Sequence, residues 1–146
     1  LETTEGNVIH YGYIEKFIEG LGERFNIREI AFDRWGAVQM VQNLEGMGFT
    51  IVPFGQGFKD MSPPTKELMK LTLEKRIAHG GHPVLRWMMD NIFIRTDPAG
   101  NIKADKEKST EKIDGAVATI MALDRAIRCG NDNGASVYDT RGILFI

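Results

Sequence analysis

Two aspartates, Asp33 and Asp114, are the residues of this sequence that could do chemistry together. Asp33 directly follows a short apolar-rich segment, residues 27–32, which predicts a buried strand that ends at the aspartate. Open α/β sheets bind ligands at the carboxyl ends of parallel strands, so one interpretation of Asp33 is a metal-binding carboxylate. The other interpretation, favoured for Asp33 alone, is a turn or helix-capping aspartate ahead of the next helix.

Asp114 lies in the first turn of the last predicted helix. The residues three, four and seven positions further on are apolar, namely Val117, Ala118 and Met121. A carboxylate at the edge of an apolar stripe must be compensated, partly by the helix dipole and more fully by a bound divalent cation. The neighbouring Gly115 should let another element approach closely. Taken alone, an ordinary acid at a helix start remains the favoured interpretation.

The two aspartates together suggest more than either does alone. A carboxylate at a strand end and another on a helix packed over the sheet can build an oxygen site for a hard cation. In phosphodiester cleavage, two Mg²⁺ ions about 3.5–4 Å apart activate a water and stabilise the leaving oxygen. We therefore expect the carboxylates of Asp33 and Asp114 to lie within roughly 4–8 Å of each other. Two carboxylates are few for such a site, and a third is expected to complete it.

Other groups of reactive residues favour structure over chemistry. Segment 55–59 (GQGFK) lacks the spacing of a Walker phosphate loop, which favours a flexible loop. His79 and His82 lie on a glycine-rich turn with no third ligand in the pattern, so zinc is disfavoured there. We expect Trp35 and Trp87 in the core.

Length and composition describe one globular domain. The chain has 146 residues, of which 42% are hydrophobic and 26% charged, with a net charge of -2. Seven basic side chains against four acids between Lys59 and Arg95 are compatible with phosphate contacts, but a solvated helix face explains them better. The single cysteine, Cys129, excludes an internal disulfide and favours a reducing, cytosolic setting. The acidic start without Met is expected of a processed or excised domain rather than of a secretory signal.

The elements that must position the two aspartates alternate between helix and strand. Apolar spacing predicts a helix over 8–25, a strand over 27–33, a helix from 38 to about 46 and a strand over 49–54. This order, with short connections, predicts a parallel strand pair joined by a right-handed crossover. Parallel strands are buried on both faces, so two of them make an incomplete sheet, and something should pair beside the first.

The second half of the sequence predicts three helices and a β-hairpin. We expect a helix from Ser62-Pro63-Pro64 to about Ala78, followed by a short helix over 83–91. A hairpin should follow over 92–103, with its turn at Asp97-Pro98-Ala99-Gly100. The last predicted helix is capped by Ser109 or Thr110 and has an apolar stripe from Ile113 to Ile127, and a flexible carboxyl-terminal tail is expected over 129–146.

Four blocks of sequence, in this order, resemble the carboxyl-terminal nuclease domain of the large terminase subunits of tailed bacteriophages. The blocks are 30–35 (IAFDRW), 62–68 (SPPTKEL), 79–88 (HGGHPVLRWM) and 108–118 (KSTEKIDGAVA). The ending 136–142 (SVYDTRG) is also similar to the tail of that family.

The resemblance implies an RNase H-like α/β fold, present here in part, over residues 1–128. It implies a metal-dependent endonuclease that holds two divalent ions, Mg²⁺ or Mn²⁺, with acidic side chains. Such an enzyme cuts concatemeric double-stranded DNA during genome packaging in the cytoplasm of the bacterial host. Asp33 matches the family's acid after the fourth core strand and Asp114 its acid on the last helix, so both are the expected catalytic and metal-ligating residues.

In the family, the first acid lies on the first core strand, which comes earlier in the sequence than the position that matches Leu1. In the family, three core strands in all and the amino-terminal ATPase motor come before the position that matches Leu1. The resemblance therefore implies that this chain is a fragment, which can be inactive by itself. The partners implied are double-stranded DNA, the small terminase subunit and the portal protein, with no membrane. An exposed strand edge predicts a homo-oligomer.

Two alternatives stay open beside the nuclease. One is a catalytically inactive prophage remnant that acts as a DNA- or portal-binding module. The other is an unrelated α/β nucleotide-binding domain, which the missing phosphate loop disfavours.

Overall fold

The structure is a computed structural model that describes residues 3, 5–6, 10–33 and 38–129. The predicted tail over 129–146 therefore lies outside the described residues, except for Cys129 at the end of the last helix. In chain order the elements are α1 (Tyr11–Arg24), β1 (Ile30–Asp33), α2 (Val38–Gly46), β2 (Ile51–Phe54), α3 (Phe58–Leu73), α4 (Pro83–Asp90), β3 (Ile94–Thr96), β4 (Ile102–Ala104) and α5 (Asp114–Cys129).

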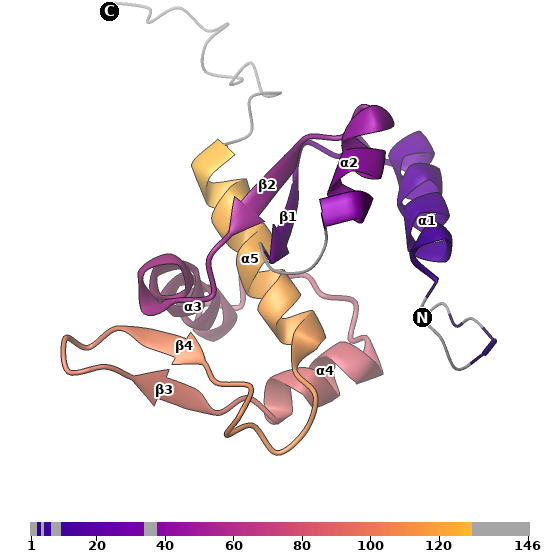
Figure 1. Cartoon of the computed structure of the whole chain (residues 1–146). Coiled ribbons are helices and arrows are strands. Elements are labelled where there is room, and N and C mark those ends of the chain that lie inside the picture. Colours follow the sequence, from indigo (N-terminus) through magenta and orange to yellow (C-terminus); the bar gives the residue numbers. More distant parts are fainter. Residues whose placement is uncertain (1–2, 4, 7–9, 34–37, 130–146) are drawn as a thin grey trace, which may run out of the picture.

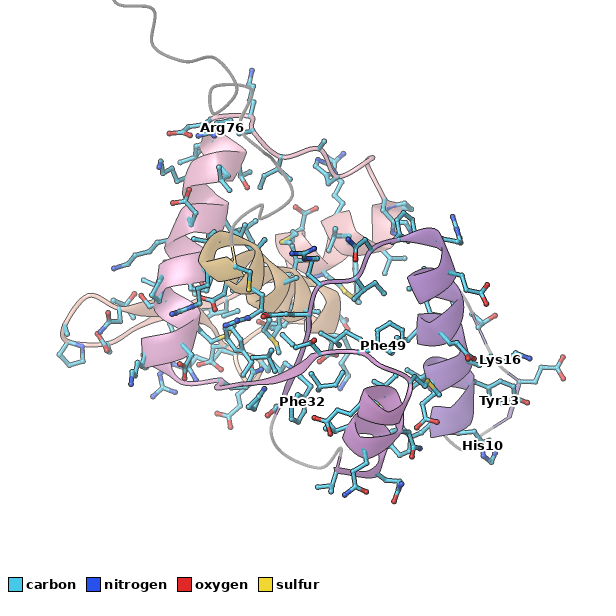
Figure 2. All side chains as sticks on the ribbon, turned by 90° about the horizontal axis from the view of Figure 1, so that it is seen from above. His10, Tyr13, Lys16, Phe32, Phe49 and Arg76 are labelled. Carbon is cyan, nitrogen blue, oxygen red and sulfur yellow. The ribbon has the colours of Figure 1, made fainter. Side chains whose placement is uncertain are left out.

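β1 and β2 form the predicted parallel pair. Ile30 is paired with Ile51 at one end of the register and Asp33 with Phe54 at the other. In both views the pair lies between α5 on one side and α2 with α1 on the other (Figure 1, Figure 2). Among the described strands, β1 pairs with β2 alone, so its other edge has no strand beside it. The prediction of an incomplete sheet is thus confirmed for the described residues.

The core is built around α5. The apolar stripe of this helix recurs every three or four residues, which turns one face toward the sheet and α3. Ile113, Ala116 and Ile120 are at most 2% exposed and pack with Phe54 and Met61. The stripe ends earlier than predicted, because Ile127 is 54% exposed.

The helix α3 differs from its prediction at both ends. It begins at Phe58, so Pro63 and Pro64 lie inside the helix rather than in its first turn. Proline removes backbone hydrogen bonds, but the fully buried Met61 anchors the first turns in the core and offsets that loss. The helix ends at Leu73 and not near Ala78, since Lys75 takes a left-handed conformation with φ of 56°.

The β3–β4 hairpin is confirmed, and Asp97 shapes its turn. One carboxylate oxygen of Asp97 accepts hydrogen bonds from the backbone N–H groups of Ala99 at 2.9 Å and Asn101 at 2.8 Å. The other accepts one from the side-chain amide of Asn101. Gly100, with φ of 77°, takes the left-handed position that closes the turn.

Two further expectations were wrong. Ser109 and Thr110 do not cap α5, because Ser109 bonds the backbone of Asp105 and Phe93, and Thr110 bonds the side chain of Asn91. Trp87 is 44% exposed rather than in the core, since the face of α4 that packs against α5 and the core carries Leu85, Met88 and Met89 instead. Trp35 lies outside the described residues.

Candidate active site

Asp33 lies where the sequence predicted, at the carboxyl end of β1. Its strand partner Phe54 is only 5% exposed and anchors this end of the strand pair in the core. The Asp33 side chain itself is exposed. The strand therefore presents a carboxylate to solvent from a fixed backbone position.

Asp114 is the first residue of α5 and is fixed in the same way. The residues on either side of its turn, Ile113 and Ala116, are buried at 2% and 0% exposure, while the Asp114 side chain is 64% exposed. The helix start is thus held in the core and its carboxylate is directed outward. The partial positive charge of the helix amino terminus favours the ionised form.

The close approach predicted at Gly115 is confirmed. The Met88 thioether sulfur accepts a hydrogen bond from the Gly115 backbone N–H at 3.2 Å. A Cβ atom at position 115 would lie 2.7 Å from that sulfur. A larger residue at position 115 would therefore force the Met88 side chain to move at the contact between α4 and α5 next to Asp114.

Lys106 is a residue of the site that sequence reasoning missed. Its Nζ lies 2.6 Å from Oδ1 of Asp114. The Lys106 hydrogen bond is the main cause that holds the pKa of Asp114 below its usual value, with a smaller contribution from the charge of Lys112. Helical spacing could not reveal this pair, because Lys106 lies in the loop between β4 and α5.

That loop is organised by Asp105, which is 5% exposed. One carboxylate oxygen of Asp105 accepts the backbone N–H groups of Glu107 at 3.0 Å and Lys108 at 3.3 Å. Its other oxygen, Oδ2, is buried without a hydrogen-bond partner and faces Arg95 Nη1 at 3.7 Å. Such a turn fixes the main chain at Lys106 directly beside the start of α5.

The two aspartates lie on elements that touch each other, since β1 packs against α5. Their predicted carboxylate separation of roughly 4–8 Å stays a prediction. Within 10–33 and 38–129, no three His, Cys, Asp or Glu side chains are grouped so as to hold a metal ion. Carboxylate oxygens are the ligands that Mg²⁺ and Mn²⁺ prefer, and both aspartates expose theirs to solvent.

The remaining candidates from the sequence are structural in the described chain. Segment 55–59 is not a free loop throughout, because Gly57 is the N-cap of α3 and Phe58 begins the helix. His79 and His82 are both exposed, and His79 accepts a hydrogen bond from the backbone of Gly81. No described helix is long and apolar enough to cross a membrane.

The basic side chains between Lys59 and Arg95 are all exposed. Four of them lie on α3 or α4, as the favoured interpretation of a solvated helix face predicts, and the other three lie outside these helices. Their exposure also leaves all of them accessible to a phosphate. The seven are Lys59, Lys66, Lys70, Lys75, Arg76, Arg86 and Arg95.

A groove of about 460 Å³ runs between α5 and the segment that leads into β1. Exposed alanines of α5 form part of its wall, and a partly buried ion pair joins Glu29 to Arg125 at 2.6 Å across it. The Glu29 carboxylate raises the pKa of the nearby Cys129 thiol, and burial adds to the effect. The groove residues are Ile27, Arg28, Glu29, Ile30, Ala31, Ala118, Met121, Ala122, Arg125, Ala126 and Cys129.

This chain is similar in sequence to one protein family and to two individual relatives. A family model described as the terminase large subunit, endonuclease domain, matches residues 1–129. The large terminase subunit of Enterobacteria phage HK97 is 40% identical over 128 residues, which cover 86% of this chain and 25% of that protein. Protein YmfN of Escherichia coli (strain K12) is 33% identical over 129 residues, which cover 87% of this chain and 28% of that protein.

The fold agrees with the sequence similarity. The crystal structure of the HK97 bacteriophage large terminase matches with a TM-score of 0.77 at 39% identity, over 86% of this chain and 26% of that one. The chain therefore spans about a quarter of the length of the relatives that it matches.

Proposed function

Because the chain belongs to the family of terminase large-subunit endonuclease domains, we propose that it forms part of a metal-dependent endonuclease. The substrate proposed is concatemeric double-stranded DNA, cut during phage genome packaging in the cytoplasm of the bacterial host. The observation that carries the proposal is the placement of Asp33 and Asp114. One ends a core strand, the other begins the helix packed on that strand, and both present exposed carboxylates.

The two aspartates are proposed as catalytic and metal-ligating residues. Two divalent ions, when bound, supply a nucleophilic water and stabilise the leaving oxygen in phosphodiester cleavage. Asp33 and Asp114 would hold the cations through their carboxylate oxygens. The buried residues around each aspartate, Phe54 for Asp33 and Ile113 for Asp114, keep both backbones in place.

We propose that the fold is RNase H-like, with further strands pairing on the free edge of β1. The free edge and the apolar groove beside α5 offer both the hydrogen-bonding groups and the space for a strand. Relatives extend far beyond the matched quarter, and the family resemblance implies that the added strands carry the third acid. The whole protein would then also meet the small terminase subunit and the portal protein.

Plasmid cleavage by the complete parent protein tests the proposed function. In Mn²⁺, Asp33→Ala and Asp114→Ala should each abolish cleavage. A matched control is Asp90→Ala, which removes an exposed acid from the end of α4 and should leave cleavage unchanged. Undiminished cleavage in both site variants would reject the assignment.

The alternative is a catalytically inactive prophage remnant that binds DNA or portal protein. It stays open because Asp33 and Asp114 alone are few ligands for a two-metal site, and the described residues hold no group of three His, Cys, Asp or Glu side chains that could bind a metal ion. Cleavage and binding measured together separate the two functions. A binding module shifts duplex DNA in a gel in the presence of EDTA but cuts no plasmid in Mn²⁺, whereas the proposed nuclease cuts the plasmid and loses that cleavage in both aspartate variants.

A further inference from the structure

The ion pair between Lys106 and Asp114 occupies an oxygen that a divalent cation would need. Lys106 Nζ donates a hydrogen bond to Asp114 Oδ1 at 2.6 Å. Both side chains are more than half exposed, at 54% and 64%, so ions from solvent reach the pair. An ammonium group thus already balances the charge of this carboxylate.

The position of Lys106 is set by a hydrogen-bonded turn and not by a loose loop. The preceding residue, Asp105, is buried and accepts backbone hydrogen bonds from Glu107 and Lys108. Ser109 closes the turn by donating its hydroxyl to the Asp105 carbonyl at 2.7 Å. Because the main chain is already ordered, pairing with Asp114 costs only the side-chain freedom of Lys106.

Resting on the proposed function, we propose that Lys106 is a positioning residue that sets the metal affinity of Asp114. Its ammonium group holds the carboxylate until a divalent cation displaces it from Oδ1. The ammonium and the dication repel each other and compete for the same oxygen. Exposed ion pairs are weak, so the competition should reduce metal affinity about two- to fivefold.

The nearby Lys112 provides a control for charge alone. Lys112 acts on Asp114 through space, whereas Lys106 acts first through a direct hydrogen bond. Lys106→Met and Lys112→Met change the net charge equally. A difference between them therefore isolates the direct contact from the general field.

The experiment measures Mn²⁺ binding to the full chain by the relaxation rate of water protons. We expect Lys106→Met to bind Mn²⁺ about two- to fivefold more tightly than wild type. Lys112→Met should change the affinity less. Lys106→Arg keeps the positive charge and should bind Mn²⁺ as wild type does. Asp114→Asn should lose binding. Urea denaturation of each variant establishes that it folds.

The outcomes separate the inference from the function on which it rests. Binding that disappears in Asp114→Asn but is unchanged or weakened in Lys106→Met would leave the metal site standing and overturn the role of Lys106. Equal gains in Lys106→Met and Lys112→Met would also overturn it, because charge alone would then explain both. Binding that is insensitive to Asp114→Asn, or absent from all the proteins, would overturn the proposed metal site and this inference together.

Discussion

The Met88 sulfur lies 3.2 Å from the backbone nitrogen of Gly115, and this contact joins α4 to the start of α5 directly beside Asp114. A side chain at position 115 would place its Cβ atom 2.7 Å from the sulfur, closer than real contacts allow. The geometry of the candidate site therefore depends on a glycine that itself has no chemistry.

Substitution of that glycine should destabilise the fold. Gly115→Ala forces Met88 to move, and overpacking of this kind costs about 1–3 kcal/mol in the free energy of unfolding. Urea denaturation measures the loss. Gly12→Ala is the control, because a Cβ atom there meets nothing within 4 Å, and alanine favours a helix. Two results would show that the contact between Met88 and Gly115 is not tight in solution. One is a Gly115→Ala variant as stable as wild type, and the other is a stability loss from Gly115→Ala that does not shrink when Met88→Ala is added.

Asp97 should make the stability of the hairpin depend on pH. Hydrogen bonds from the side chain and backbone of Asn101 hold the pKa of Asp97 below its usual value. A lowered pKa in the folded state means that the stabilisation is present above the pKa of the unfolded chain, about 3.9, and is lost as pH falls through the folded pKa. Asp97→Ala should therefore lower the urea midpoint at pH 7, and the difference from wild type should shrink in acid.

The control for Asp97 is Asp90→Ala, which removes an exposed carboxylate at the end of α4. Its urea midpoint should follow wild type at both pH values. A difference between Asp97→Ala and wild type that stays constant from pH 7 into acid would show that the ionised carboxylate is not what stabilises the turn.

Magnesium binding to this chain should be weak. Asp33 and Asp114 are the acids of the proposed set that the chain supplies, and the number of oxygen ligands sets affinity for hard cations. Isothermal calorimetry with MgCl₂ should give a shallow titration that does not reach stoichiometric saturation at equal concentrations. Tight binding of one ion per chain would contradict this, and would indicate that acids outside the described residues complete the site.

Much of the fold could be predicted because hydrophobic spacing reports directly on burial. The parallel pair of β1 and β2, the hairpin turned by Asp97 and the buried stripe of α5 all follow from local patterns. The start of α3 could not be predicted in this way. Pro63 reads as a helix start, and only the burial of Met61 in the tertiary structure lets the helix begin earlier at Phe58.

The candidate site was predictable only in its two aspartates. Asp33 and Asp114 are marked by their places at a strand end and a helix start. Lys106 and Asp105 lie in a loop, where no periodicity exists and hydrogen bonds to nearby backbone decide which side chains meet.

The free edge of β1 predicts self-association of this chain. An unpaired strand edge exposes hydrogen-bonding groups in a row, and the apolar groove beside it gives a second strand a surface on which to pack. Exposed aromatic side chains of α1, such as Tyr13 and Phe17, add further apolar surface.

Light scattering at several concentrations should show a molar mass that rises from the monomer toward the dimer. Ala122→Lys places a charge in the groove and should keep the chain monomeric, whereas Ala99→Lys, at the exposed hairpin turn, should associate like wild type. A wild-type chain that stays monomeric at every concentration would mean that this edge is covered by other parts of its own polypeptide.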